Sequence, residues 1–225
     1  MDSKKNKKKC DLISRRGLLK SMAVAGAGLV AAPMLNFGRF RLFANSPTEY
    51  SARAIGLVKE STVIDMLCVM TLDFAKQDKW FKDPETFTAA DLQPWKDSGI
   101  NVIHPALGMG GMTSYQNVLE FFAFWNGFIA SHDEHFMRID SPDDFARVKK
   151  SNKLGVILGL QNSDQFRNPN DVDFFRNLGQ RVSQLTYNSR NFIGTGSTER
   201  NDSGISDFGA AIIARMNKVI NGEPE

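Results

Sequence analysis

Apolar runs without regular polar alternation recur along this sequence, and patterns typical of helices separate them. The runs predict buried strands at residues 63–72, 100–105, 154–160 and 181–186. The patterns between and after them predict helices at residues 88–99, 114–131, 141–150, 171–178 and 206–220. Continuous apolar strands that alternate with helices are typical of a parallel sheet covered by helices. The sequence therefore predicts an α/β fold.

Local signals mark the starts of several of these helices. Thr88 and Asp91 have the spacing of a capping box, with Asp in place of the usual Glu. Ser141 followed by Pro142 predicts an N-cap with a proline at the first helical position. Ser206 is expected to cap the last helix. Capping residues therefore mark the starts of three of the predicted helices, in addition to their apolar faces.

Four strand–helix units of this kind fit either a small open α/β sheet or about the first four units of a (β/α)8 barrel of the TIM type. Both architectures place ligands at the carboxyl ends of the strands. Polar residues stand at all four predicted strand ends, at Asp73, His104, Gln161 and Tyr187–Asn188. We therefore expect a functional site at this rim, which by itself does not distinguish an open sheet from a barrel.

Composition and charge exclude several classes of protein. Of the 225 residues, 42% are hydrophobic and 24% are charged, which is ordinary for a globular domain and excludes a disordered or collagen-like chain. The charge is unevenly placed. Residues 1–45 contain ten Lys and Arg against two Asp and Glu, whereas residues 46–225 contain 18 against 23, a net charge of −5. The body of the chain therefore has no basic footprint for nucleic acid.

The basic first segment, residues 1–45, has the pattern of an export signal. Arg15–Arg16 stand beside Leu18–Leu19–Lys20, and an Ala- and Gly-rich apolar stretch follows at residues 22–32. Paired arginines before a short apolar stretch resemble a twin-arginine signal. The alternative is a membrane-anchoring helix, which the shortness of the stretch disfavours. We therefore expect the bacterial twin-arginine machinery to be a partner of this chain.

Cleavage of the signal is expected after Ala32 or after Ala44, and the two positions fit equally well. The body, residues 46–225, then keeps one cysteine, Cys68, because Cys10 lies in the leader. It therefore has no internal disulfide, as suits a domain that is exported already folded. We expect a periplasmic protein, which would stay at the cytoplasmic membrane if the signal were left uncleaved.

Several single residues are candidates for chemistry. His104 is interpreted as a metal ligand, a general base or a histidine held by backbone hydrogen bonds. Asp73 supplies a carboxylate at the end of the first strand, and together with Asp65 it would give a site with few oxygen ligands. His132 and His135 follow an aromatic helix on the opposite rim, so we interpret them as a solvated helix end rather than a metal site.

Short segments in the second half of the body occur in a specific order. They are residues 154–161 (LGVILGLQ), 178–181 (LGQR), 185–188 (LTYN) with Asn191, 204–209 (GISDFG) and 216–217 (MN). In order and spacing they resemble the membrane (renal) dipeptidase family of zinc peptidases, over about residues 60–220. The resemblance implies a (β/α)8 barrel that hydrolyses dipeptides with two zinc ions.

The resemblance also implies where the zinc ligands belong. The family's first strand carries D-G-H-x-D, whose His and second Asp bind metal, and here Leu67 and Val69 take those places. Gln161 stands where the family has a metal-bridging Glu. Aliphatic side chains have no lone pair for zinc, and a neutral amide does not offset two dications. The family's other zinc histidines come from later strands, so we expect that this chain does not retain the zinc cofactor.

The remaining implied contacts are to substrate. Tyr187 takes the place of a substrate-contacting His in the renal-type sequences, and a tyrosine can still donate a hydrogen bond to a carbonyl. Asn188 and Asn191 either cap backbone groups of their loop or bind a polar ligand. The predicted substrate-binding set is therefore Gln161, Tyr187, Asn188, Asn191, His104 and Asp73, with no catalytic or metal-binding residue.

Two functions from different classes follow from these residues. The first is a hydrolase of the dipeptidase family, in which a metal-bound hydroxide attacks a peptide carbonyl and whose catalytic half is missing from this chain or supplied elsewhere. The second is a non-catalytic protein that binds a dipeptide or small amide at Gln161, Tyr187 and Asn191. A truncated gene product is a third interpretation. Because half a barrel leaves two open strand edges, we also expect self-association.

Overall fold

The computed structural model describes residues 39–41, 49–108 and 110–220, and the chain divides into two compact units, Met1–Leu57 and Val58–Glu225. The arginine pair and both cleavage positions of the predicted signal lie outside the described residues. The predicted division into a leader and a body at residue 45 therefore stays a prediction.

The first unit contains a small hairpin. β1 (Arg39–Arg41) and β2 (Glu49–Ser51) pair antiparallel, and α2 (Ala52–Glu60) begins directly after β2. The Oγ of Ser51 accepts a hydrogen bond from the N–H of Ala54 at 3.2 Å, which is the contact of a helix-capping serine. The sequence patterns did not predict these elements.

The second unit alternates strands and helices. Its strands are β3 (Ile64–Cys68), β4 (Val102–Leu107), β5 (Phe136–Arg138), β6 (Leu154–Val156), β7 (Leu158–Leu160) and β8 (Gln180–Ser183). Its helices are α3 (Phe74–Lys82), the 3-10 helix η2 (Pro84–Thr86), α4 (Ala89–Ser98), α5 (Ser114–Ser131), α6 (Asp143–Ser151), α7 (Asp171–Asn177) and α8 (Asp207–Ile220).

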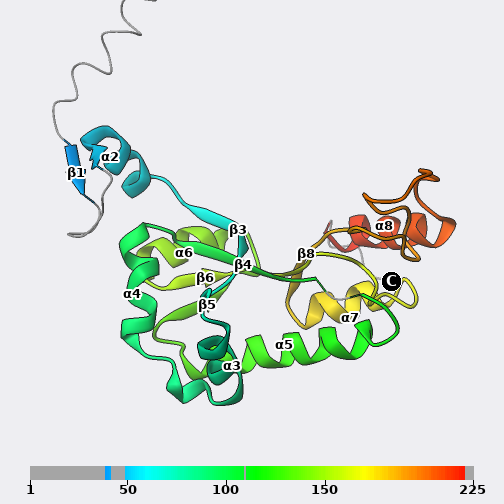
Figure 1. Ribbon diagram of the computed structural model, residues 1–225, viewed down its shortest axis with the longest axis horizontal. Helices are drawn as coiled ribbons and strands as arrows, with labels where there is room; N and C mark the ends of the chain where they lie inside the picture. Colours follow the sequence, from blue (N-terminus) through cyan, green and yellow to red (C-terminus); the bar gives the residue numbers. More distant parts are fainter. Residues whose placement is uncertain (1–38, 42–48, 109, 221–225) are drawn as a thin grey trace, which may run out of the picture. The chain divides into compact units, whose positions relative to one another are not determined.

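The strands of this unit pair in parallel (Figure 1). β4 lies between β3 on one side and β6 and β7 on the other. β6 and β7 are the two halves of the predicted strand at 154–160, interrupted at Ile157. β5 pairs with β6, and β8 pairs with β7. The predicted α/β fold with a parallel sheet is confirmed.

The sheet presents two faces, because side chains alternate along each strand. The α5 face carries Ile103, Val156, Leu158 and Leu160, which belong to the main core together with the buried side of α5. The α6 face carries Val102 and Ile157, which pack with Ile139 and with Val148 of α6. Both faces of a parallel sheet need such cover, since apolar side chains project from each.

The aromatic residues of α5 form the centre of the main core. Phe122, Trp125 and Phe128 are almost completely buried. The ring of Phe128 lies 5.3 Å from that of Phe87 and 5.4 Å from that of Phe136, in the edge-on and tilted arrangements that aromatic pairs prefer. The expectation that this helix serves packing rather than ligand binding is confirmed.

Two of the three predicted helix starts are confirmed. The N–H of Thr88 donates to Asp91 Oδ2 at 2.8 Å, as a capping box requires. The Oγ of Ser206 accepts from the N–H of Gly209 at 2.9 Å, so it caps α8 as expected. Gly99, with φ of 79°, follows α4 in the left-handed conformation that glycine tolerates.

The prediction of a buried first strand is wrong. β3 covers residues 64–68 instead of 63–72, and most of it is exposed, because it pairs only with β4 among the described strands. Cys68 and Met70 are buried, whereas Met66 and Leu72 are 51% and 80% exposed. An apolar run therefore marks an edge strand here, which periodicity alone does not distinguish from a central one.

Three elements of the second unit, α3, η2 and β5, were not predicted from the sequence patterns. α3 is mostly polar, with Trp80 as its buried residue. β5 has the sequence Phe-Met-Arg and is too short to show alternation, and its place in the sheet comes from parallel pairing with β6. Within the described residues, no helix is long and apolar enough to cross a membrane.

The start of α6 depends on one carboxylate. The helix begins at Asp143, one residue after the predicted position, and Asp144 Oδ2 accepts hydrogen bonds from the N–H groups of Asp140 and Ser141 at 2.9 Å each. Burial opposes ionisation of Asp144, but these bonds, the Ser141 hydroxyl and nearby Arg147 outweigh it and hold the pKa of the carboxyl below its ordinary value of 3.8.

Replacing Asp144 by Asn should therefore lower the free energy of unfolding by about 1 kcal/mol at neutral pH, the cost of a lost helix cap. A carboxyl group whose pKa is lower in the folded protein stabilises the fold at pH values above its ordinary pKa. This stabilisation is lost as the pH falls through the folded-state pKa. The difference in free energy of unfolding between the parent protein and Asp144→Asn should therefore shrink in acid. Urea unfolding at neutral pH and at about pH 3 measures this. Asp143→Asn, an exposed neighbour, is the control; an equal loss in that variant contradicts the assignment.

Candidate functional site

His104 lies in the middle of β4, not at its end, and its side chain is buried on the α6 face. Nδ1 stands 2.7 Å from the carbonyl oxygen of Met66. A carbonyl oxygen only accepts, so Nδ1 donates this hydrogen bond, and in the neutral form of the ring the lone pair lies on Nε2. Nε2 is buried and has no hydrogen-bond partner within the described residues. A histidine in this state can accept a proton or a metal ion.

A glycine makes room for this ring. At Gly159 of β7, a Cβ would lie 2.0 Å from Nε2 of His104 and 2.8 Å from Cβ of Val182. Both distances are below any that real Cβ atoms show, so a side chain at this position would displace the histidine. Gly159 is therefore part of the geometry that holds His104.

Gln161 follows β7 directly and is half-buried. Its N–H donates to the carbonyl of Leu107 at 2.8 Å, which continues the pairing with β4 by one residue. Its Oε1 lies against the backbone of Gly108, where a Cβ would come within 2.6 Å. The side chain therefore rests under the loop that leaves β4.

The same loop contacts the next residues of the chain. The N–H of Gly111 donates to Asp164 Oδ2 at 3.1 Å, and a Cβ at Gly110 would lie 2.4 Å from that oxygen. Asn162 Oδ1 and Asp164 Oδ1 are buried without a hydrogen-bond partner in the described part of the chain. The loops after β4 and β7 thus pack together, which the sequence reading did not foresee because it takes each strand end separately.

Leu67 and Val69, at the positions where the family resemblance implies metal ligands, are 64% and 52% exposed. Asp65 Oδ1 accepts a hydrogen bond from the N–H of Leu67 at 3.0 Å, and Asp73 Oδ1 accepts from the N–H of Lys76 at 3.0 Å. Asp73 therefore serves as the N-cap of α3, five residues past the end of β3. One oxygen of each carboxylate is therefore engaged in a local backbone contact.

Tyr187 lies in a separate, polar pocket of about 450 Å³ in the loop that follows β8. Glu199, Asp202, Gln184 and Thr195 also line it. The ring of Tyr187 is 46% exposed, and its carbonyl accepts from the N–H of Ser197 at 2.8 Å. Of the predicted substrate-binding set, Tyr187 is the member that lines this pocket.

The side chain of Asn191 binds backbone groups of this loop, whereas Asn188 Oδ1 accepts a hydrogen bond from the Ser197 hydroxyl at 3.3 Å. Asn191 Nδ2 donates to the carbonyl of Leu185 at 2.9 Å, and its Oδ1 accepts from the N–H groups of Ile193 and Gly194. The carbonyl of Asn188 accepts from Thr198 at 2.9 Å. These contacts fix the loop that holds Tyr187.

The carboxylates of Glu199 and Asp202 are absent from the predicted set, although they give the Tyr187 pocket its charge. The signal was available as the uninterrupted polar run at residues 197–203. That run lies more than ten residues past β8, too far for a strand-end rule to include it. Of the predicted rim residues, the structure brings His104 and Gln161 to one sheet face and Tyr187 to a loop pocket, and their binding role stays a prediction.

The solvated helix end predicted for His132 is wrong. Its ring is 6% exposed, its Nδ1 stands 2.9 Å from the carbonyl of Phe128, and it packs against the rings of Phe87 and Phe136. His135 is half-buried beside Glu134. The histidine that follows α5 is therefore part of the aromatic core, because the chain turns back there to enter β5.

Comparisons with known proteins address the family resemblance. The membrane dipeptidase family (peptidase family M19) matches residues 51–220. No curated protein sequence gives a significant match.

An amidohydrolase from Pseudomonas aeruginosa is 26% identical, with a TM-score of 0.57, over 73% of this chain and 46% of that protein. The probable dipeptidase PvdM from the same organism is 18% identical, with a TM-score of 0.59, over 74% and 47%. A metallopeptidase from Rhodobacter sphaeroides, bound to a phosphinate mimic of the dipeptide L-Ala-D-Ala, is 12% identical, with a TM-score of 0.51, over 70% and 56%. The chain thus spans about half the length of these proteins.

The family is zinc-dependent, and the donor atoms in this chain do not fit zinc. Leu67 and Val69 offer no lone pair, and Gln161 offers a neutral amide oxygen that already lies against Gly108. Within the described residues, no group of three or more His, Cys, Asp or Glu side chains is placed to hold a metal ion. His104 Nε2 is a suitable donor atom, but a single imidazole does not make a zinc site.

The packing of His104 over Gly159 can be tested by substitution. Gly159→Ala should lower the free energy of unfolding by about 1–3 kcal/mol, because the added methyl group collides with the ring and with Val182. Thermal and urea unfolding measure the loss. Gly127→Ala is the matched control: its Cβ meets nothing within 4 Å in α5, and alanine there should stabilise by about 0.5–1 kcal/mol. A stable Gly159→Ala protein would contradict the described position of His104.

Proposed function

Because the chain belongs to the membrane dipeptidase family (peptidase family M19), we propose that it is an exported member that binds a small peptide or amide without hydrolysing it. The replacement of three metal-ligand positions by Leu67, Val69 and Gln161 carries the proposal. A metal-bound hydroxide needs a cation held by imidazole, thiolate or carboxylate groups. Two aliphatic side chains and an amide do not supply them.

The Tyr187 pocket supports the binding part of the proposal. The carboxylates of Glu199 and Asp202 suit the ammonium group of a dipeptide, and the Tyr187 hydroxyl can donate to its carbonyl. No cationic side chain lines this pocket, so a free carboxylate ligand is disfavoured there. The pocket volume of about 450 Å³ falls within the usual range for small-molecule sites.

One observation favours the hydrolase as a second candidate function. His104 presents an unpartnered Nε2 lone pair on the same sheet face as Gln161. If donors from outside the described residues joined it, His104 would be the group of this chain able to bind a metal or accept a proton. Measurement of metal content separates the two candidates.

The full chain, dialysed after incubation with zinc, should hold clearly less than one zinc per chain and should not cleave L-Ala-L-Ala. The variant Leu67→His/Val69→Asp/Gln161→Glu restores the donor types of the family and should retain more zinc than the parent protein. Elemental analysis by mass spectrometry and a ninhydrin assay measure the two quantities. Near-stoichiometric zinc in the parent chain, with chelator-sensitive cleavage, would refute the non-catalytic proposal.

The same preparation should bind L-Ala-L-Ala in isothermal titration calorimetry. Tyr187→Phe should weaken this binding by roughly three- to tenfold, the worth of one hydrogen bond. Tyr50→Phe, which changes an exposed tyrosine of the first unit, should leave the affinity unchanged. Absence of binding in a folded, zinc-free parent protein would rule out the peptide-binding function, and an unchanged Tyr187→Phe would rule out this pocket.

Self-association is part of the proposal, because β3 presents Ile64, Met66, Leu67 and Val69 to solvent. An edge strand with an exposed apolar row invites pairing with another chain. Sedimentation velocity should show concentration-dependent association that Leu67→Lys/Val69→Lys reduces. Met112→Lys, at a fully exposed loop residue, is the control. A strictly monomeric parent chain over the accessible concentration range would overturn this expectation.

Export rests on residues 1–45, and we propose the twin-arginine route to the periplasm. In a bacterial host, the full chain should appear in the periplasmic fraction. Arg15→Lys/Arg16→Lys keeps the charge and removes the arginine pair, so the variant should remain in the cytoplasm. Lys7→Arg/Lys8→Arg is the control for charge. Equal periplasmic amounts of parent and Arg15→Lys/Arg16→Lys protein would show that this route is not used.

A further inference from the structure

A second cavity, distinct from the Tyr187 pocket, lies between α7, β8 and the last turn of α8. It measures about 330 Å³, within the usual range for small-molecule sites. Its lining runs along β8 from Gln180 to Ser183 and includes residues near the carboxyl ends of both helices. None of the predicted substrate-binding residues lines it.

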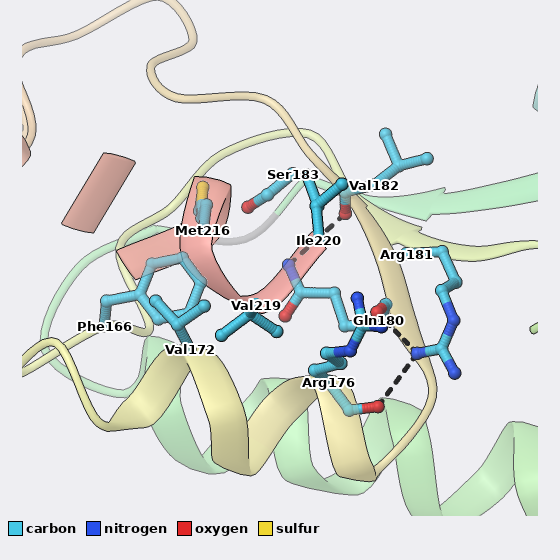
Figure 2. Close-up of a pocket in the computed structure, with 10 residues that line it drawn as sticks. All are labelled: Phe166, Val172, Arg176, Gln180, Arg181, Val182, Ser183, Met216, Val219 and Ile220. Atoms are coloured by element: carbon cyan, nitrogen blue, oxygen red, sulfur yellow. Dashed lines mark hydrogen bonds between the residues drawn. The ribbon is translucent and has the colours of Figure 1, made fainter. Parts of the chain in front are cut away.

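The cavity has one apolar and one polar side. Figure 2 shows Phe166, Val172 and Met216 on one side, with Arg176, Gln180 and Arg181 on the other. Phe166 and Val172 belong to the buried core, so the apolar wall is fixed by packing. The cavity therefore offers a ligand a rigid apolar wall opposite polar and cationic groups.

The two arginines of the polar side differ in their hydrogen bonds and ion pairs. Arg181 is engaged: its Nη2 lies 2.7 Å from Asp140 Oδ1, and its Nη1 donates to the carbonyls of Arg176 and Gln180 at 2.9 Å each. It thereby satisfies the end of α7, where helix carbonyls are otherwise unpaired. The guanidinium of Arg176 makes no hydrogen bond or ion pair within the described part of the chain, although Asp173 lies in the same helix and pairs with Arg215.

Positive charge is in excess around this side. Asp140 is shared between Arg138, at 2.8 Å, and Arg181, at 2.7 Å. Burial lowers the pKa of Arg181 from its ordinary value. The charge of Asp140 opposes this effect, and the smaller contributions of Arg176 and Arg138 add to the lowering. An anion beside Arg176 would relieve this repulsion.

We propose that this cavity binds a small amphipathic anion, an aliphatic carboxylate whose charge lies against Arg176 and whose hydrocarbon chain lies along Phe166, Val172 and Met216. A guanidinium without a partner is a strong site for a carboxylate, because it can donate two parallel hydrogen bonds. A free amino acid is a poor ligand, since its ammonium group meets the same cations. The inference is independent of the peptide-binding function, because it rests on a different set of residues.

Hexanoate is the probe, titrated by calorimetry into the full chain. Binding should weaken by about fourfold for each CH2 removed, so butanoate should bind roughly 15-fold more weakly than hexanoate. Hexylammonium should not bind, and hexanol should bind more weakly than hexanoate. Leucine, which has both a carboxylate and an ammonium group, should bind more weakly than 4-methylpentanoate.

Arg176→Gln should weaken hexanoate binding at least tenfold and leave hexanol binding unchanged. Arg200→Gln, at an exposed arginine outside the cavity, is the matched control and should bind hexanoate as the parent chain does. Equal melting temperatures of the three proteins establish that Arg176→Gln is folded. No hexanoate binding by the parent chain, or equal binding by Arg176→Gln, overturns the proposal. If the parent chain binds hexanoate but not L-Ala-L-Ala, the peptide-binding function is refuted and the present proposal stands.

Discussion

The parallel pairing of β4 with the strand at residues 154–160 is the constraint on which the second unit depends. Val102 pairs with Gly155 and Ala106 with Gly159, so the register is held at both ends. A parallel pair is stable only where its faces are covered, and the buried side of α5 covers one of them. The same register fixes the chemistry, because it sets His104 over Gly159 and carries the N–H of Gln161 to Leu107.

The other face of the sheet is covered unevenly. Val148 of α6 packs over Val102 and Ile157, where the strands begin, whereas Leu67 and Val69 of the outer strand stay exposed. Their apolar character thus has two consequences. It removes the donors that a dication needs, and it leaves hydrophobic surface in water, which folded monomers usually avoid. The proposed loss of metal chemistry and the proposed self-association therefore rest on the same side chains.

The sequence predicts the interior of this fold well. The bounds of α5 are those expected, and the caps at Thr88 and Ser206 form as the spacing indicates, because these signals act within a few residues. It fails where tertiary context decides. The apolar run that contains β3 does not show that this strand pairs on one edge only among the described strands. The three residues of β5 form a strand because they pair with Leu154–Val156.

The candidate site is predictable to a lesser degree, for a related reason. The strand-end rule locates Gln161 where the structure has it, directly after β7. It places Tyr187 at a strand end, whereas β8 ends at Ser183 and Tyr187 belongs to a loop held by Asn191. It misses Glu199 and Asp202, which meet Tyr187 only after the loop has folded back.

The distribution of charge then bears on function. On the sheet face where the family's chemistry belongs, the described side chains are a buried imidazole, an amide and exposed aliphatic groups. Two further carboxylates, those of Glu199 and Asp202, line a pocket with a phenol in the loop after β8. A peptide bond is cleaved where a cation and its hydroxide are held against the carbonyl, and carboxylates in a separate loop cannot hold that cation. They can hold an ammonium group, and this is why recognition is the function that these residues support.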